Sequence, residues 1–219
     1  MLFDLYETLV TERGLDVPRA GKLGPTFGIP TETFRPVWKA QRTRIVRGEL
    51  TFRHALIEIG AQLDVPIDPA TVDRVCEERL RAKRMVMQRS NPEVAAMTRA
   101  LGERGMRLAV VSNCMEEDVA AWQESALAPH FSTVLFSHMI RIAKPDPGIY
   151  LEAIRRLGTR PAETLFVGDA AVEEIVGARN AGLHAACATW FLPIDATHPG
   201  LTGIPLVSTP GELLELLRQ

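Results

Sequence analysis

Residues 164–188 read TLFVGDAAVEEIVGARNAGLHAACA, and their hydrophobic pattern is the clearest indication of the fold. It opens with a short apolar run that predicts a buried strand leading into Gly168-Asp169. Residues 173–181 follow as a helix, and Gly182 suits its C-cap because glycine readily adopts the left-handed conformation found there. Residues 183–188 predict a second strand. Strand, helix and strand in this order indicate a parallel sheet.

The same alternation extends through the rest of the C-terminal half, where apolar runs predict strands and amphipathic runs predict helices. The expected strands are residues 108–111, 131–136 and 205–207, and the expected helices are 116–127, 147–157 and 210–217. A first strand of only three residues, 1–3, begins the chain. We therefore expect an α/β fold with a doubly wound parallel sheet.

Residues 13–88 differ from the rest of the chain because no segment among them has the pattern of a strand. The expected helices there are residues 33–46, 51–63 and 71–87. The chain should therefore form two domains. Residues 1–12 and 89–219 would make the α/β core, and residues 13–88 would be an all-helical domain inserted after the first strand.

The composition excludes several classes of protein. The 219 residues carry a formal net charge of −2, which provides no basic field for nucleic acid or an anionic membrane. Arg79, Arg81, Lys83 and Arg84 form a local basic cluster, which we interpret as the solvated face of a helix.

Segments for membrane insertion or export are not expected. No apolar run is long enough to cross a bilayer, and the N-terminus lacks the pattern of a signal peptide. Cys76, Cys114 and Cys187 have neither disulfide nor zinc spacing, which indicates reduced thiols in a cytoplasmic protein. The expected partner is a small-molecule substrate, and the oligomeric state is left open.

Polar side chains stand where four of the expected strands end: Asp4, Ser112, Lys144 and Asp169. In an open parallel sheet the carboxyl ends of the strands form the ligand-binding edge, so we expect these side chains to converge. A carboxylate can attack phosphorus. An ammonium and a hydroxyl offset charge on phosphate oxygens, and two carboxylates can hold magnesium. This set of residues therefore indicates phosphoryl transfer.

Four segments carry a resemblance to a known family. They are FDLYETLV at residues 3–10, VVSN at 110–113, AKPDP at 143–147 and FVGDAAVEE at 166–174. In this order they resemble the four motifs of the haloacid dehalogenase superfamily, and the helical insert stands where that superfamily has its type 1 cap. The resemblance extends over essentially the whole chain. It implies a Rossmann-like hydrolase core with an inserted cap domain.

The resemblance also implies a role for each matching residue. Asp4 would be the nucleophile that forms an aspartyl-phosphate. Ser112 and Asn113 would bind the substrate, and Lys144 would offset charge on the nucleophile and the phosphate. The implied ligands of Mg²⁺ are Asp4, the backbone carbonyl of Tyr6, Asp169 and Glu174.

The motif around the nucleophile departs from the family pattern at two positions. Family phosphatases have an aspartate two residues after the nucleophile, which protonates the leaving oxygen and later deprotonates water. This chain has Tyr6 there. With an ordinary pKa of about 10, tyrosine can donate a proton but is a poor base near neutrality. Glu7 replaces the usual glycine, so it must accept the backbone conformation that the glycine adopts.

A tyrosine at this position is typical of the family's 2-haloacid dehalogenases, which displace halide from carbon without a metal. Those enzymes have an arginine in the first cap helix, which Arg35 loosely matches; the alternative is an exposed helix arginine. Trp38, one turn after Arg35 and one turn before Arg42, is either a core residue or a substrate contact. Against dehalogenation, Gly168-Asp169-Ala170 has the metal-binding form of the fourth motif.

We therefore expect a magnesium-dependent phosphatase that acts on a small phosphomonoester. A metal-independent 2-haloacid dehalogenase is the first alternative, and a catalytically degenerate binding or regulatory protein is the second. The residues expected to carry catalysis are Asp4, Tyr6, Ser112 and Lys144, and those expected to bind substrate are Arg35, Ser112, Asn113 and Lys144.

Overall fold

The computed structural model describes residues 1–169, 171–193 and 198–218. Six strands form one sheet in the order β3-β2-β1-β4-β5-β6, and every neighbouring pair is parallel. The strands are β1 Leu2–Phe3, β2 Ala109–Ser112, β3 Thr133–Phe136, β4 Leu165–Gly168, β5 His184–Ala188 and β6 Leu206–Val207. The expected parallel α/β sheet is confirmed. The two segments on either side of β1 come from the C-terminal half, so the short first strand lies at the centre.

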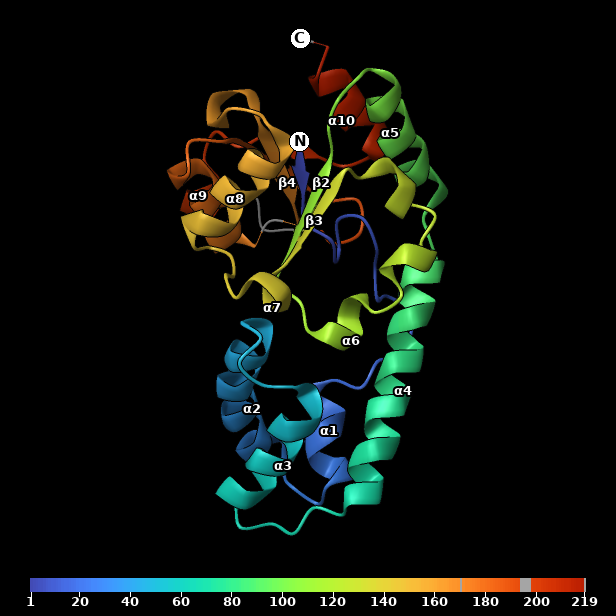
Figure 1. The fold of residues 1–219 in the computed structure, drawn as a ribbon, viewed down its shortest axis with the longest axis vertical. Coiled ribbons are helices and arrows are strands. Elements are labelled where there is room, and N and C mark those ends of the chain that lie inside the picture. Colours follow the sequence, from blue (N-terminus) through green and yellow to red (C-terminus); the bar gives the residue numbers. More distant parts are fainter. Residues whose placement is uncertain (170, 194–197, 219) are drawn as a thin grey trace.

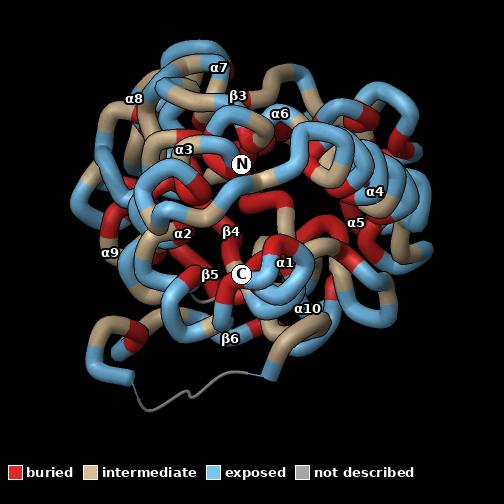
Figure 2. The backbone as a smooth tube through the Cα atoms, turned by 90° about the horizontal axis from the view of Figure 1, so that it is seen from below, coloured by how far each residue is buried: buried red, intermediate tan, exposed pale blue. Residues whose placement is uncertain are grey.

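Helices cover both faces of this sheet (Figure 1). The helices of the core are α5 Pro92–Glu103, α6 Glu116–Val119, α7 Ser137–Ile140, α8 Pro147–Leu157, α9 Val172–Asn180 and α10 Pro210–Leu216. Leu2 packs with residues of α8 and α9, whereas Phe3 packs with residues of α5 and α10. Side chains alternate between the faces of a strand, so the two residues of β1 reach both layers of the core. Figure 2 shows the strands buried at the centre and the outer helix faces exposed.

One expected helix is wrong. Residues 116–127 form the single helical turn α6 and then a short 3-10 helix, Trp122–Glu124. The chain leaves the helical path so that the Trp122 ring enters the core, where it meets Phe131 and Phe136 edge-on at 5.6 and 6.2 Å. Tertiary packing of one large aromatic side chain therefore overrides the local helical pattern.

Residues 20–88 fold into four helices that lie beyond one end of the sheet (Figure 1). They are α1 Ala20–Thr26, α2 Thr31–Val46, α3 Phe52–Gln62 and α4 Pro69–Gln88. These helices have their own apolar core, in which Trp38 stacks on Phe34 and meets Phe52 edge-on. The expected all-helical character is confirmed for this part of the chain, and Trp38 is a core residue. No described helix is both long and apolar enough to cross a membrane.

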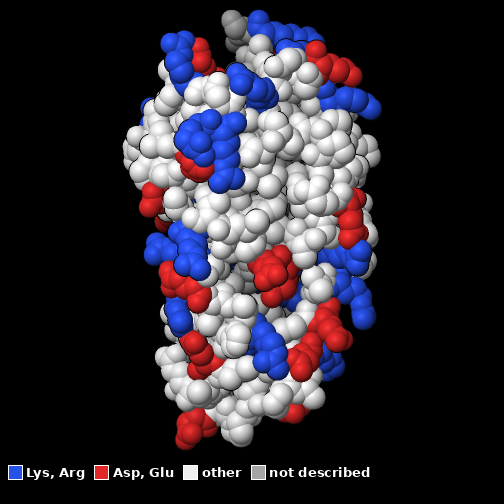
Figure 3. Space-filling view, viewed as in Figure 1, with Lys and Arg blue, Asp and Glu red and all other residues white. Residues whose placement is uncertain are grey.

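The basic cluster on α4 is not simply a solvated face, as we had expected. Arg81 and Arg84 are exposed, but Arg79 and Lys83 are only 6% and 4% exposed. Both lie on the buried stripe of α4 and point toward the α/β core. Elsewhere on the face in Figure 3, acidic and basic side chains are intermixed.

Asp118 of α6 is the centre of a buried ion network between α4 and the core. It accepts hydrogen bonds from Arg79 at 2.5 Å and from the backbone N–H of Met115 at 3.0 Å, and Lys83 lies 2.8 Å away. Lys83 also binds Glu12. Burial alone would raise the pKa of Asp118, but the two cations hold it below its ordinary value.

Loss of the Asp118 charge should destabilise the protein strongly. Asp118→Asn leaves Arg79 and Lys83 buried with one carboxylate fewer, and breaking a buried pair in this way costs about 3–5 kcal/mol. Glu124→Gln is the matched control. Glu124 pairs with Arg84, which lies on α4 like Arg79 and Lys83, but this pair is exposed and should contribute little to stability. Urea unfolding of both variants measures the difference. Equal stabilities would show that the network does not hold α4 on the core.

Candidate active site

Asp4 directly follows β1 at the carboxyl edge of the sheet. It is 7% exposed, and its backbone N–H donates to the Val167 carbonyl at 2.9 Å. The neighbouring strand β4 ends in Gly168, where an added Cβ would lie 3.0 Å from the Phe166 ring and 3.8 Å from the Asp4 Cβ. A glycine at this position therefore leaves room for the Phe166 ring next to the end of β4.

Lys144 joins two carboxylates in this site. Its side chain is fully buried, and its Nζ lies 2.5 Å from Asp4 and 2.6 Å from Glu174. Burial opposes the charge of an ammonium, but the two carboxylates outweigh it and raise the pKa of Lys144 above its ordinary value. Lys144 is therefore a fixed positive charge beside Asp4.

Asn113 holds the main chain of this lysine. Its side-chain NH₂ donates to the Lys144 carbonyl at 2.8 Å, and its side-chain oxygen accepts from the Lys144 N–H at 2.7 Å. Ser112, which precedes it, is the last residue of β2 and is 2% exposed. The end of β2 thus positions Lys144 through Asn113, a contact that the spacing of the motifs did not reveal.

Helix α9 reaches Lys144 because of a second close approach. At Gly177 an added Cβ would lie 2.7 Å from the Pro145 carbonyl oxygen, so only glycine lets the helix pack here. The Tyr150 hydroxyl of α8 donates to the Glu174 carbonyl at 2.7 Å and fixes the first turn of α9. The sequence analysis did not identify Tyr150.

Asp169 and Glu174 are acids with raised pKa values. Burial and then the Asp4 charge raise the pKa of Asp169, whose carboxylate accepts from the Ala171 N–H at 3.2 Å. Burial raises the pKa of Glu174 to about 7, against the opposing effect of Lys144. Asp4 and Glu174 thus pair with one ammonium, and Asp169 lies close enough to Asp4 for the Asp4 charge to act on it. Within residues 1–169, 171–193 and 198–218, no three His, Cys, Asp or Glu side chains form a metal-binding group.

The Tyr6 hydroxyl is engaged outside this acid–lysine cluster. It donates to the Asp118 backbone carbonyl at 2.6 Å, and the Lys83 ammonium lies 4.1 Å from the centre of its ring. Burial, followed by the Asp118 and Glu12 charges, raises its pKa well above 10.0. The structure therefore connects Tyr6 to the ion network of α4, which the sequence analysis missed. The spacing of Val72, Val75, Arg79, Lys83 and Val86 along one stripe was the available signal.

Glu7 has the backbone conformation expected where the family has glycine. Its φ of 56° lies in the left-handed region, which non-glycine residues rarely adopt. Its carboxylate accepts from the Thr11 hydroxyl at 2.7 Å and from the Glu12 N–H at 3.1 Å. These bonds within the loop offset the strain and tie the segment after Asp4 to Glu12.

Arg35 stands apart from the reacting groups, whereas Cys114 lies close enough to Ser112 and Lys144 for both to act on its thiol. Arg35 is exposed and lies beside Gly21 of α1. Cys114 is buried, 3.6 Å from the His138 Nδ1, and burial raises the pKa of its thiol.

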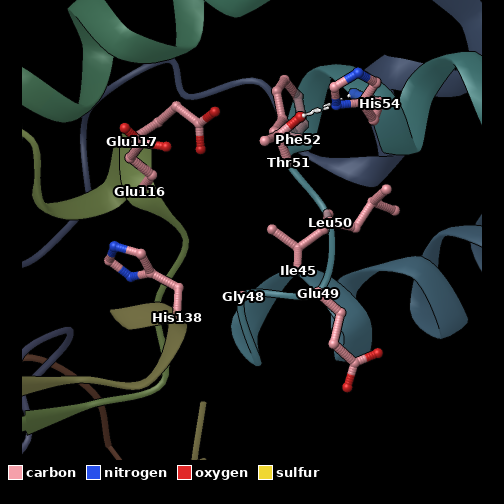
Figure 4. A pocket seen from close by; sticks show the side chains of 10 residues that line it. All are labelled: Ile45, Gly48, Glu49, Leu50, Thr51, Phe52, His54, Glu116, Glu117 and His138. Atoms are coloured by element: carbon pink, nitrogen blue, oxygen red, sulfur yellow. Dashed lines mark hydrogen bonds between the residues drawn. The ribbon is translucent and has the colours of Figure 1, made fainter. Parts of the chain in front are cut away.

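His138 lines a cavity of about 310 Å³ between the α2–α3 connection and the core (Figure 4). In Figure 4, Thr51 and His54 approach this cavity from the helical side, and Glu116 and Glu117 stand on the core side.

The chain is similar in sequence to known hydrolases. A family model described as a haloacid dehalogenase-like hydrolase matches residues 1–182. A phosphoserine phosphatase of Thermus thermophilus is 34% identical over 142 residues, covering 63% of this chain and 52% of that protein. A glyceraldehyde 3-phosphate phosphatase of Methanopyrus kandleri is 37% identical over 95 residues, covering 42% and 40%. The chain thus spans about half the length, or less, of these curated relatives.

One solved structure is similar in fold to this chain over almost its whole length. The 2-haloacid dehalogenase from Pseudomonas syringae pv. Tomato DC3000 has a TM-score of 0.67 and 25% identity, and the match covers 99% of this chain and 96% of that one.

Both tyrosines of the folded chain should stay protonated at the pH at which an exposed tyrosine ionises. Burial is the largest cause of the raised pKa of both Tyr6 and Tyr150, and each hydroxyl donates to a carbonyl. An exposed tyrosine ionises near pH 10. We expect the near-ultraviolet phenolate absorbance of the native protein to stay flat at about pH 10.5 and to rise when urea unfolds it. One phenolate appearing at about pH 10 in the folded protein would show that a hydroxyl is not held as described.

Proposed function

The chain belongs to the haloacid dehalogenase-like hydrolase family, and on this premise we propose that it hydrolyses a small phosphomonoester through a phosphorylated Asp4. The ion pair between Asp4 and Lys144 carries this proposal. It holds the Asp4 side chain at the carboxyl edge of the sheet, beside a positive charge that can attract a phosphate. The phosphatase names of the two curated relatives also support it.

The reaction would proceed in two displacements at phosphorus. An oxygen of Asp4 forms a bond to phosphorus while the ester P–O bond breaks, and the leaving oxygen takes a proton from solvent water. Water then attacks the acyl phosphate, which releases inorganic phosphate and restores Asp4. Lys144 and the Ser112 hydroxyl would offset the charge on the phosphate oxygens in both steps.

Two carboxylates and a backbone oxygen would suit a magnesium ion here. Asp4 and Glu174 pair with Lys144, and the Asp4 charge contributes to the raised pKa of Asp169, so acidic groups outnumber the one ammonium. A divalent cation with oxygen ligands would offset this excess of acid. Asp4, Asp169 and the Tyr6 carbonyl would hold it, with Glu174 nearby on Lys144. When bound, the ion would let an anionic nucleophile approach an anionic phosphate.

The helical unit of residues 13–88 would act as a cap over this site. It contacts the core through Arg79 and Lys83 of α4, whose partners lie on Glu12 and Asp118. A cap that excludes water restricts the enzyme to small substrates. We therefore infer a metabolite-sized ester.

Dehalogenation of a 2-haloacid is a second candidate, and Tyr6 favours it. A hydroxyl bound to a carbonyl, with a strongly raised pKa, is a poor acid–base group for phosphate esters. The whole-chain likeness to a 2-haloacid dehalogenase points the same way. In that reaction Asp4 would attack carbon and displace halide, and the acids at 169 and 174 would have no metal to bind.

Asp4→Asn should abolish turnover while the fold is retained, since an amide is nearly isosteric with the carboxylate but a far weaker nucleophile. The assay uses a panel of phosphate esters and 2-haloacids, with and without Mg²⁺, and circular dichroism checks the fold. Activity within about tenfold of wild type would refute Asp4 as nucleophile.

Phosphatase activity that chelator removes and Mg²⁺ restores would support the proposed function. Dehalogenase activity that is insensitive to chelator would instead support the second candidate.

The leaving group should matter strongly if Tyr6 donates no proton. Aryl phosphates expel a stable phenolate and should turn over readily, whereas alkyl phosphates should lag. General acid–base catalysis contributes about 10²–10⁴-fold, so Tyr6→Asp should raise alkyl phosphate turnover, and Tyr6→Phe should change aryl turnover little. Flat or lower alkyl turnover in Tyr6→Asp would contradict this account. In a dehalogenase the new carboxylate would instead repel a 2-haloacid.

A further inference from the structure

The segment that follows β5 is hydrogen-bonded to the loop that begins at Asp4. The Trp190 indole N–H donates to the Thr8 carbonyl at 2.8 Å. The backbone carbonyl of the next residue, Phe191, accepts a hydrogen bond from the Arg13 guanidinium at 2.5 Å. The partners lie 182 and 178 residues apart in the chain, so neither bond belongs to a local turn. The connection after β5 therefore supports the loop after β1 at two points.

Residues 5–10 form a tight hairpin directly after Asp4. Tyr6 and Val10 are paired in a β-bridge, and the Glu7 N–H donates to the Val10 carbonyl at 2.6 Å. These bonds give the hairpin a fixed internal geometry, so we expect its residues to move together. Because the hairpin begins at the residue after Asp4, any displacement of the hairpin is passed on to the peptide that follows the nucleophile.

The carbonyl of Thr8, at the turn of this hairpin, takes its hydrogen bond from elsewhere in the chain. Thr8 is fully buried, and a buried carbonyl without a hydrogen bond is costly. Among the hydrogen bonds of the described residues, only that of the Trp190 indole reaches this carbonyl. The half-buried Trp190 ring also packs on the same apolar core as Tyr6. Both the N–H and the ring of Trp190 therefore hold the hairpin.

The other contacts of Asp4 are made outside the hairpin. The Asp4 N–H donates to the Val167 carbonyl, and its carboxylate pairs with Lys144. Neither contact fixes the backbone of Tyr6, which lies in the hairpin. The position of the Tyr6 carbonyl relative to Asp4 therefore depends on whatever holds the hairpin in place.

We propose that Trp190 is a positioning residue for the reaction at Asp4. Its indole N–H holds the hairpin through Thr8, and the hairpin fixes the direction of the chain after the nucleophile. The proposal rests on Asp4 being the nucleophile, as proposed above. It applies equally to a phosphatase and to a dehalogenase, because both reactions begin with attack by Asp4. Such attack is sensitive to geometry, since a misplacement of about 1 Å can cost about 100-fold in rate.

Trp190→Phe tests the proposal, because phenylalanine keeps an aromatic ring but has no N–H. The assays use 4-nitrophenyl phosphate with Mg²⁺, and 2-chloropropionate. On the substrate that the wild type hydrolyses, we expect kcat to fall by about tenfold or more and KM to stay within about twofold.

Trp122→Phe is the matched control. It makes the same change of side chain in the same apolar core, where Trp122 packs against Phe131 and Phe136. Its kcat should stay within about twofold of wild type, even if its melting temperature falls as far as that of Trp190→Phe. An unchanged kcat in Trp190→Phe, a rise in KM alone, or an equal loss of kcat in both variants would overturn the proposal.

Amide hydrogen exchange tests the hairpin without turnover. The N–H groups of Glu7, Leu9 and Val10 are all bonded within the hairpin. We expect Trp190→Phe to speed their exchange by about tenfold or more, and Trp122→Phe to leave it unchanged. Unchanged exchange in Trp190→Phe would overturn the proposal. If the wild type hydrolyses neither substrate, the proposed function fails, and the exchange rates still decide whether Trp190 holds the hairpin.

Discussion

The burial of the Lys144 ammonium between Asp4 and Glu174 is the constraint on which the site depends. A buried charge is costly unless it is paired and hydrogen-bonded. Three segments far apart in the chain must therefore meet at one point. One close approach helps to bring them there, because Gly177 lets α9 pack on the Lys144 segment.

Much of this arrangement was predictable because it follows from strand ends. A parallel sheet collects the carboxyl ends of its strands along one edge, so the sequence alone predicts Asp4, Ser112 and Asp169 at that edge. The expected helix over 116–127 was wrong because a local pattern of apolar residues carries no information about distant packing partners, such as those of Trp122. Those partners, Phe131 and Phe136, stand later in the chain.

The contacts of Tyr6 and of the α4 cations were not predictable in the same way. The Tyr6 hydroxyl bonds to Asp118, which lies 112 residues away in the chain. Charged residues such as Arg79 and Lys83 normally indicate a solvated helix face. Only their helical spacing from the apolar Val75 and Val86 indicated that they lie on the buried face of α4. The arginine expected near the substrate, Arg35, is exposed beside α1.

The loop from Asp4 to Glu12 links two charge networks that would otherwise be separate. Asp4 at its start pairs with Lys144 in the core, and Glu12 at its end pairs with Lys83 on α4. Glu7 ties the middle of the loop to its end through the Glu12 N–H. A displacement of α4 from the core would break the bonds of Lys83 to Glu12 and Asp118. The position of the helical unit is therefore coupled, through one short loop, to the segment that carries Asp4.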